Sequence, residues 1–127
     1  MIVGIGVDEV EVPRMAEVLV RTPSTRRRLF TDGEQAYAER AEPGMAAQRY
    51  AARFAAKEAV LKSFGVGLGA CRFVDIEVVR HEGSGAATLA LHGAAAALAA
   101  VRGVATVHLS MTHTAERAVA FVVAESA

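Results

Sequence analysis

The feature that most constrains this fold is the stretch 45–64, which contains neither glycine nor proline. Alanine, arginine, lysine and glutamate dominate it, and these are good helix formers. The stretch therefore predicts one long central helix, packed on a sheet and ended by Gly65, Gly67 and Gly69. The glycine run is not a dinucleotide-binding loop, because that loop follows a strand and opens a helix.

Shorter patterns flank this helix. β-Branched and alternating segments predict strands over 2–12, 73–80, 86–92, 104–112 and 117–125. Helices are predicted over 13–20, from Thr31 to about Arg40, and over 94–102. Thr31 and Glu34 have the spacing of a capping box, and Glu82 to Gly85 form the turn of a hairpin. The order is not a strict βαβ alternation, so we expect an α+β fold of helices and antiparallel strands.

Size and composition exclude several classes of protein. With 127 residues and 53% hydrophobic residues, the chain 1–127 is expected to be a single globular domain. Fourteen basic and fourteen acidic residues cancel, which gives no general attraction to nucleic acid or membrane. The only cysteine, Cys71, excludes a disulfide framework and fits a reducing compartment. The N-terminus opens without a basic segment and soon meets Asp8 and Glu9, so we expect a cytoplasmic protein without a signal peptide.

An acidic residue interrupts the apolar first strand. Asp8 lies on the strand face that also carries Ile2, Gly4, Gly6 and Val10. A carboxylate among small and apolar residues is costly to bury unless it is paired or binds a cation. We expect the glycines to leave room beside the backbone for a ligand. The alternative is that Asp8 marks the solvated end of an edge strand.

A second carboxylate, Glu58, lies in the long helix on its apolar side, and Lys62 follows four residues later. The simplest interpretation is a Glu–Lys pair that stabilises the helix by about 0.2–0.5 kcal/mol. The functional interpretation makes Glu58 a metal ligand and Lys62 a phosphate partner or a base. Two carboxylates, completed by water and substrate phosphate, suit Mg²⁺.

Basic residues recur along the same helix. Arg49, Arg53 and Lys57 form a column that is either a solvated face or an anion site, since guanidinium geometry matches phosphate. His108 and His113 would point to opposite faces of an extended strand, which argues against a shared zinc site. His113 either lines a pocket at the strand end or is simply exposed.

Four blocks of sequence recur together in a known family. They are 4–8 (GIGVD) through Arg14; Phe30-Thr31 with Glu34 and Tyr37; 53–59 (RFAAKEA) with Lys62 and Gly65; and 108–113 (HLSMTH) with Ala118. In this order and spacing they resemble the holo-acyl-carrier-protein synthases, the small phosphopantetheinyl transferases. Glu9, Ala87 and Thr112 depart from the family's usual residues, and none of the three is among the expected metal ligands.

The resemblance implies transfer of the 4'-phosphopantetheine arm of coenzyme A to a serine of apo acyl carrier protein, with release of 3',5'-ADP and a need for Mg²⁺. It implies that Asp8 and Glu58 hold the metal and that Glu58 and Lys62 act in catalysis. The residues that it assigns to coenzyme A are Arg53, Lys62, Gly65 and His113. Lys62, Glu58 or a metal-bound water could take the serine proton.

The resemblance also implies partners. Arg14 and the helix that follows Pro13 would face the acidic carrier protein, and three copies of the chain would form a homotrimer with sites between neighbours. The arginines at 26–28 either extend this docking face or form a solvated turn. Two alternatives are a catalytically silent module that binds coenzyme A or carrier protein, and a subunit with only an oligomeric role. The intact Asp8, Glu58 and Lys62 argue against the first of these, and the mid-strand acid argues against the second.

Overall fold

The structure is a computed structural model and describes residues 1–127. Its elements, in chain order, are β1 (Ile2–Glu11), α1 (Val12–Arg21), α2 (Thr25–Leu29), α3 (Asp32–Glu39), α4 (Pro43–Ser63), the 3-10 helix η1 (Phe73–Asp75), β2 (Ile76–Arg80), β3 (Ala87–Leu91), α5 (Gly93–Val101), β4 (Thr106–His113) and β5 (Arg117–Glu125).

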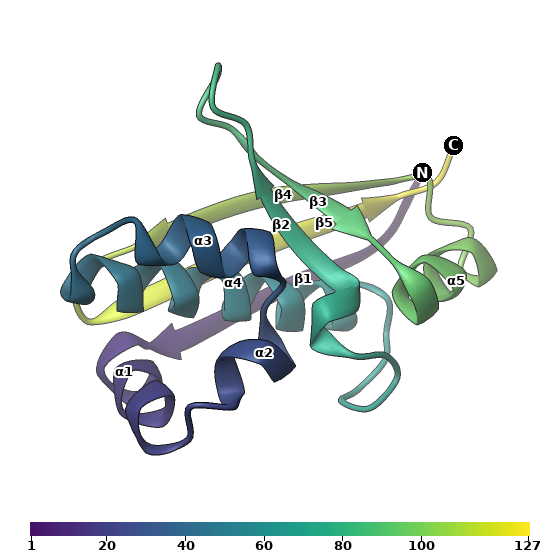
Figure 1. The fold of residues 1–127 in the computed structure, drawn as a ribbon. Coiled ribbons are helices and arrows are strands. Elements are labelled where there is room, and N and C mark those ends of the chain that lie inside the picture. Colours follow the sequence, from purple (N-terminus) through teal and green to yellow (C-terminus); the bar gives the residue numbers. More distant parts are fainter.

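The strands form two antiparallel sheets. One has three strands in the order β1-β5-β4, and the other is the hairpin β2–β3. The long helix α4 lies against the three-stranded sheet, and the tip of the hairpin projects from the molecule (Figure 1). The termini lie side by side, where the Met1 ammonium donates a hydrogen bond to Ser126 Oγ over 3.0 Å. This arrangement confirms the α+β prediction and the central helix.

Very small residues bring α4 close to the sheet. Several of its alanines are completely buried, among them Ala55, Ala56 and Ala59. On the sheet side, Gly4 and Gly6 of β1 lie so close that an added Cβ would sit 1.9 Å from the carbonyl oxygens of Ser63 and Ala59, respectively. The expectation that these glycines leave room for a ligand is therefore wrong, because the backbone of α4 fills that space.

Local predictions near the N-terminal helices and the hairpin have mixed outcomes. The capping box is confirmed: Thr31 Oγ1 accepts from the Glu34 backbone N–H over 3.2 Å, and the Thr31 N–H donates to Glu34 Oε1 over 2.9 Å. The strand predicted over 73–80 begins only at Ile76, because the Asp75 carboxylate accepts from the Arg72 backbone N–H and holds 73–75 in a 3-10 turn. The arginines at 26–28 lie in the short helix α2 and not in a turn.

The sheet face opposite α4 is apolar and open. Val3, Ile5 and Val7 of β1 are 41%, 54% and 51% exposed, and Phe121 of β5 is 44% exposed. We call these four residues the open face.

No helix of the structure is both long enough and apolar enough to span a membrane.

Candidate active site

Side chains from β1 and α4 meet at one edge of the three-stranded sheet. The Lys62 ammonium donates to Asp8 Oδ1 and to the Val7 carbonyl oxygen, each over 2.9 Å. Asp8 is only 14% exposed although β1 is an edge strand, so it does not mark a solvated strand end. The predicted Glu58–Lys62 helix pair is wrong, since the ion pair of Lys62 is with Asp8. We call Asp8, Glu58 and Lys62 the carboxylate site.

The electrostatics of Glu58 show how close the two acids lie. Burial raises the pKa of Glu58 above its ordinary value, and the negative charge of Asp8 raises it further, against the opposing charge of Lys62. A carboxylate whose ionisation is disfavoured by a neighbouring negative charge marks a place where a cation is stabilised. No group of three His, Cys, Asp or Glu side chains is arranged to hold a metal ion.

A hollow of about 230 Å³ adjoins the carboxylate site. Its lining residues are Glu58, Leu61, Lys62, Val66, Gly67 and Leu68. Gly65 precedes this wall with φ +71°, a conformation that only glycine adopts without strain. The structure thus confirms Gly65 as the end of the long helix and places it directly before the wall of the hollow.

A second pocket, of about 380 Å³, lies between α4, the hairpin and β4. Its lining residues are Tyr37, Arg49, Arg53, Arg80, Gly85, Ala86, Ala87, Leu109, Ser110, Met111 and His113. Three of its arginines have the guanidinium carbon over the Tyr37 ring, at 4.1 Å from the centroid for Arg49, 4.4 Å for Arg53 and 5.5 Å for Arg80. No acidic side chain lines this arginine pocket, so its field favours an anion.

Two residues of the arginine pocket, Arg53 and His113, have unused hydrogen-bonding atoms. Arg53 is 3% exposed, yet its Nε and Nη2 atoms have no hydrogen-bond partner. Leaving buried donors unpartnered is costly in free energy unless a ligand accepts from them. Burial and the charges of the neighbouring arginines lower the pKa of His113. Its Nδ1 lies 2.7 Å from Gln48 Oε1 and therefore donates to it, so Nε2 accepts in the neutral ring and would donate to an anion only when the ring is protonated. A bound anion would supply the partners that Arg53 lacks.

The basic column of α4 does not form a solvated face. Arg49 and Arg53 turn toward the arginine pocket, whereas Lys57 is completely buried and pairs with Glu34. The two histidines of β4 have separate partners, Glu125 for His108 and Gln48 for His113.

The carboxylate site and the arginine pocket do not meet within one chain. Arg53 and Lys62 are nine residues apart on α4, about two and a half turns, and point to opposite sides of it. Asp8 and His113 lie on β1 and β4, the two edges of the sheet, with β5 between them. The residues that the resemblance assigns to coenzyme A are thus split, with Arg53 and His113 in one group and Lys62 in the other.

Sequence reasoning did not assign two lining residues of the arginine pocket, Tyr37 and Arg80, or the residue that binds His113, Gln48. Tyr37 entered only as part of a motif, and Arg80 and Gln48 were not singled out. Arg80 ends a strand just before a glycine-rich turn, and this position is only a weak indication of a binding residue. For Gln48 the sequence carries no signal, since only the packing of β4 beside α4 brings it to His113.

Comparison with known proteins gives consistent results. Residues 4–122 match the family model of the 4'-phosphopantetheinyl transferase superfamily. A holo-[acyl-carrier-protein] synthase of Clavibacter michiganensis subsp. michiganensis is 50% identical over 125 residues, with 98% of this chain and 97% of the relative covered. A protein of the same name from Anaeromyxobacter sp. (strain K) is 46% identical over 129 residues, with 98% and 97% covered. A crystal structure of a holo-(acyl-carrier-protein) synthase from Bacillus anthracis str. Ames in complex with CoA (3',5'-ADP) is similar with a TM-score of 0.83 and 36% identity, covering 100% of this chain and 99% of that one.

Proposed function

This chain belongs to the 4'-phosphopantetheinyl transferase superfamily, and from that premise we propose that it moves the 4'-phosphopantetheine arm of coenzyme A to a serine of an apo acyl carrier protein. It is an enzyme of the holo-[acyl-carrier-protein] synthase type. In the proposed reaction, the serine oxygen attacks the phosphorus that carries the arm, the bond from that phosphorus to 3',5'-ADP breaks, and the serine proton passes to a base.

The observation that carries this proposal is that the carboxylates of Asp8 and Glu58 lie close together beside Lys62. The Lys62 ammonium donates to Asp8 Oδ1 and to the Val7 carbonyl oxygen of β1. Displacement at a pyrophosphate depends on charge neutralisation and positioning more than on covalent help from the enzyme. Lys62 has three donors, of which Asp8 and the Val7 carbonyl use two, so one remains for a phosphate oxygen. Burial and the charge of Asp8 raise the pKa of Glu58, which makes its carboxylate a stronger base than an ordinary glutamate.

The residues present fit Mg²⁺ as the cation of this site. The fit rests on the mutual repulsion of Asp8 and Glu58, which a cation would relieve, and on a ligand set of oxygen atoms with room for water and phosphate. Asp8 and Glu58 would hold the ion, which when bound would neutralise charge on the pyrophosphate.

The arginine pocket is the proposed site for other phosphate of coenzyme A. Arg53 offers two unpartnered donor atoms and Arg49 and Arg80 add positive charge, while His113 would donate from Nε2 when its ring is protonated. Arginine geometry suits the bidentate binding of phosphate. Gly65 and the wall after it would border the arm beside the carboxylate site.

One complete site requires two copies of the chain, because the two groups of residues face opposite sides of α4. We propose a homotrimer in which the carboxylate site of one copy meets the arginine pocket of the next. The open face of Val3, Ile5, Val7 and Phe121 supports association, since exposed apolar patches of this kind commonly mark interfaces between proteins.

We propose α1 as the docking element for the carrier protein. Arg14 and Arg21 are exposed on this helix, and Arg27 and Arg28 are exposed on α2, which follows it. A basic surface of this kind would attract an acidic partner and orient its approach.

The direct test of the function is mass spectrometry of an apo carrier protein after incubation with this protein, coenzyme A and Mg²⁺. We expect the carrier to gain one phosphopantetheine and 3',5'-ADP to accumulate. An unmodified carrier, together with measurable binding of coenzyme A, would support the catalytically silent module instead.

Two variants test the metal ligands. Asp8→Ala and Glu58→Gln are each expected to stay folded and to lose about 100-fold or more of the Mg²⁺-dependent rate. Near-parental turnover in either variant would refute the assignment.

Mixing variants tests the shared site. Asp8→Ala and Arg53→Ala should each be inactive alone, whereas reassembled mixtures should regain about a quarter of the sites if each site draws on two subunits of a symmetric ring. A monomer with full activity in sedimentation experiments would refute the trimer.

A further inference from the structure

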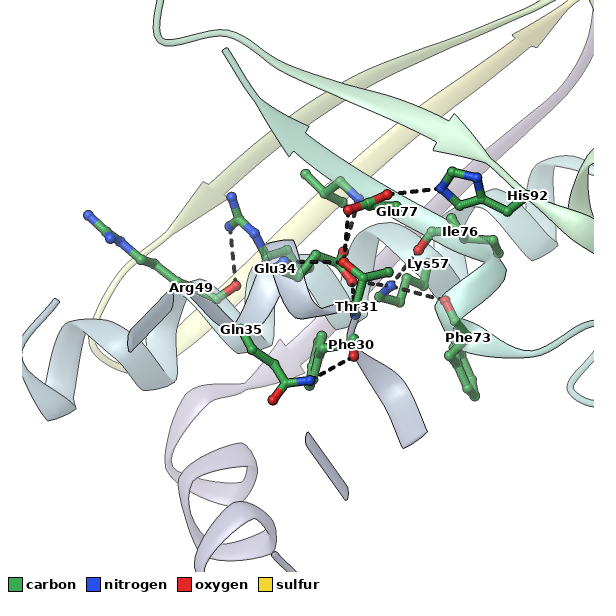
Figure 2. A network of polar contacts seen from close by, with 12 residues as sticks. Phe30, Thr31, Glu34, Gln35, Arg49, Lys57, Phe73, Ile76, Glu77 and His92 are labelled. Atoms are coloured by element: carbon green, nitrogen blue, oxygen red, sulfur yellow. Dashed lines mark hydrogen bonds and ion pairs between the residues drawn. The ribbon is translucent and has the colours of Figure 1, made fainter. Parts of the chain in front are cut away.

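Glu34 of α3 carries a buried charge that belongs to neither site. It is 1% exposed, and its carboxylate accepts three hydrogen bonds (Figure 2). The donors are the Thr31 backbone N–H over 2.9 Å, the Lys57 ammonium over 2.7 Å and the Val78 backbone N–H over 2.9 Å. Only the bond from Thr31 serves the capping of α3, so the other two call for a separate explanation.

Lys57 is the buried partner of this carboxylate. Besides its bond to Glu34, the ammonium donates to the carbonyl oxygens of Phe73, over 3.0 Å, and Ile76. All three of its donors are used. Replacing a fully satisfied buried ion pair by apolar residues is often neutral or even stabilising, whereas removing one partner alone is costly. Stability by itself is therefore a weak reason for a chain to keep this pair.

The two oxygens of Glu34 bind different walls of the arginine pocket. Oε1 is bound to Lys57 of α4, one helical turn beyond Arg53. Oε2 is bound to the N–H of Val78 in β2, two residues before Arg80. The hairpin β2–β3 shares no strand pairing with the three-stranded sheet. Its placement on α4 depends on the packing of Ile76 and Val78 against α4 and on polar contacts, among them the bond from Lys57 to the Ile76 carbonyl oxygen and the bonds of Glu34.

We infer that Glu34 is a positioning residue for coenzyme binding: by joining Lys57 to Val78, it sets the distance between the Arg53 and Arg80 guanidinium groups. This inference rests on the proposed function. Glu34 does not line the pocket, so its hydrogen bonds act through the two walls, while its negative charge also acts on Arg53. A glutamine at position 34 would have one acceptor oxygen and one amide donor, and could therefore accept from only one wall.

The test is the binding of 3',5'-ADP, measured by isothermal titration calorimetry, together with the KM values for both substrates. Glu34→Gln is expected to bind 3',5'-ADP about tenfold more weakly, because small displacements of positioned groups are expensive. The KM for coenzyme A should rise with it, and the KM for the carrier protein should stay as in the parent.

Two further variants separate positioning from stability. Asp75→Asn is the matched control: Asp75 is 3% exposed and its carboxylate binds Arg72 and no residue of α4. It should lower stability and leave the affinity for 3',5'-ADP unchanged. The double variant Glu34→Gln/Lys57→Met removes the unpaired ammonium, so it should regain stability while its affinity for 3',5'-ADP stays low. If Glu34→Gln does not fold, the double variant decides.

Parental affinity in Glu34→Gln, or affinity that returns with stability in the double variant, would overturn the inference. The same holds if Asp75→Asn weakens the binding of 3',5'-ADP as much as Glu34→Gln does, because loss of stability would then explain both. If the parent neither binds 3',5'-ADP nor modifies a carrier protein, the proposed function fails and this inference with it. If the parent binds 3',5'-ADP and Glu34→Gln binds it equally well, only the role of Glu34 is overturned and the proposed function stands.

Discussion

Replacing Gly6 by alanine should force apart the two elements that carry the carboxylate site. An ideal Cβ at Gly6 would lie 1.9 Å from the carbonyl oxygen of Ala59 and 2.8 Å from its carbonyl carbon. Both atoms belong to the backbone of α4 and no rotamer change can move them. To open the closest contact to 3.0 Å, α4 and β1 would have to separate by about 1.1 Å.

The loss of stability caused by this separation depends on the packing around Ala59. Ala59 lies in a core cluster with Val60 and with Val122 of β5, all fully buried, so a shift of the helix disturbs packing along the sheet. Overpacking a core typically costs about 1–3 kcal/mol. Because rigid backbone is displaced here, we expect the upper end, about 3 kcal/mol, which for a domain of this size lowers Tm by about 10 °C. Asp8, two residues along β1, would move away from Glu58.

The assay is denaturant and thermal unfolding of parent and Gly6→Ala at one fixed protein concentration, because association shifts apparent stability. Gly44→Ala is the matched control: no atom lies within 4 Å of its added Cβ, and as a residue in the first turn of α4 it should keep or raise stability by up to about 1 kcal/mol. An unfolding midpoint of Gly6→Ala equal to that of the parent would refute the close approach of β1 and α4.

Three further predictions concern the carboxylate site, the arginine pocket and the docking helix α1. Because burial and Asp8 raise the pKa of Glu58, the folded state keeps this proton to higher pH than the unfolded chain, and ionisation of Glu58 costs stability as pH rises through the raised pKa. Glu58→Gln should therefore be more stable than the parent near pH 7 but not below its ordinary pKa of 4.5, and an equal gain in unfolding free energy at both pH values would contradict this. Arg53→Lys should bind 3',5'-ADP about tenfold more weakly in calorimetry, because an ammonium cannot reproduce the guanidinium fork; parental affinity would show that Arg53 contributes charge alone. Arg14→Ala should raise the KM for the carrier protein, leave that for coenzyme A unchanged and flatten the inhibition by salt, whereas a selective effect on coenzyme A would place Arg14 in the nucleotide site.

Sequence reasoning predicted those parts of the fold that depend on neighbouring residues. The long helix, the capping box of Thr31 and Glu34, and the helix end at Gly65 all depend on local hydrogen bonds and backbone conformations, which short-range patterns record. The 3-10 turn before β2 was missed. There the Asp75 carboxylate accepts a hydrogen bond from the Arg72 backbone N–H, and this bond outweighs the strand propensity of the neighbouring residues.

The sequence by itself determined which chemistry this chain can carry: two acids, a lysine and an arginine column in the order of a known family. Only the tertiary structure decided what each group meets. It pairs Lys62 with Asp8 and not with Glu58, buries Lys57 against Glu34, and places Arg53 on the side of α4 opposite to Lys62. Burial and ion pairing depend on segments far apart in the chain, and no local pattern records which of them will pack together.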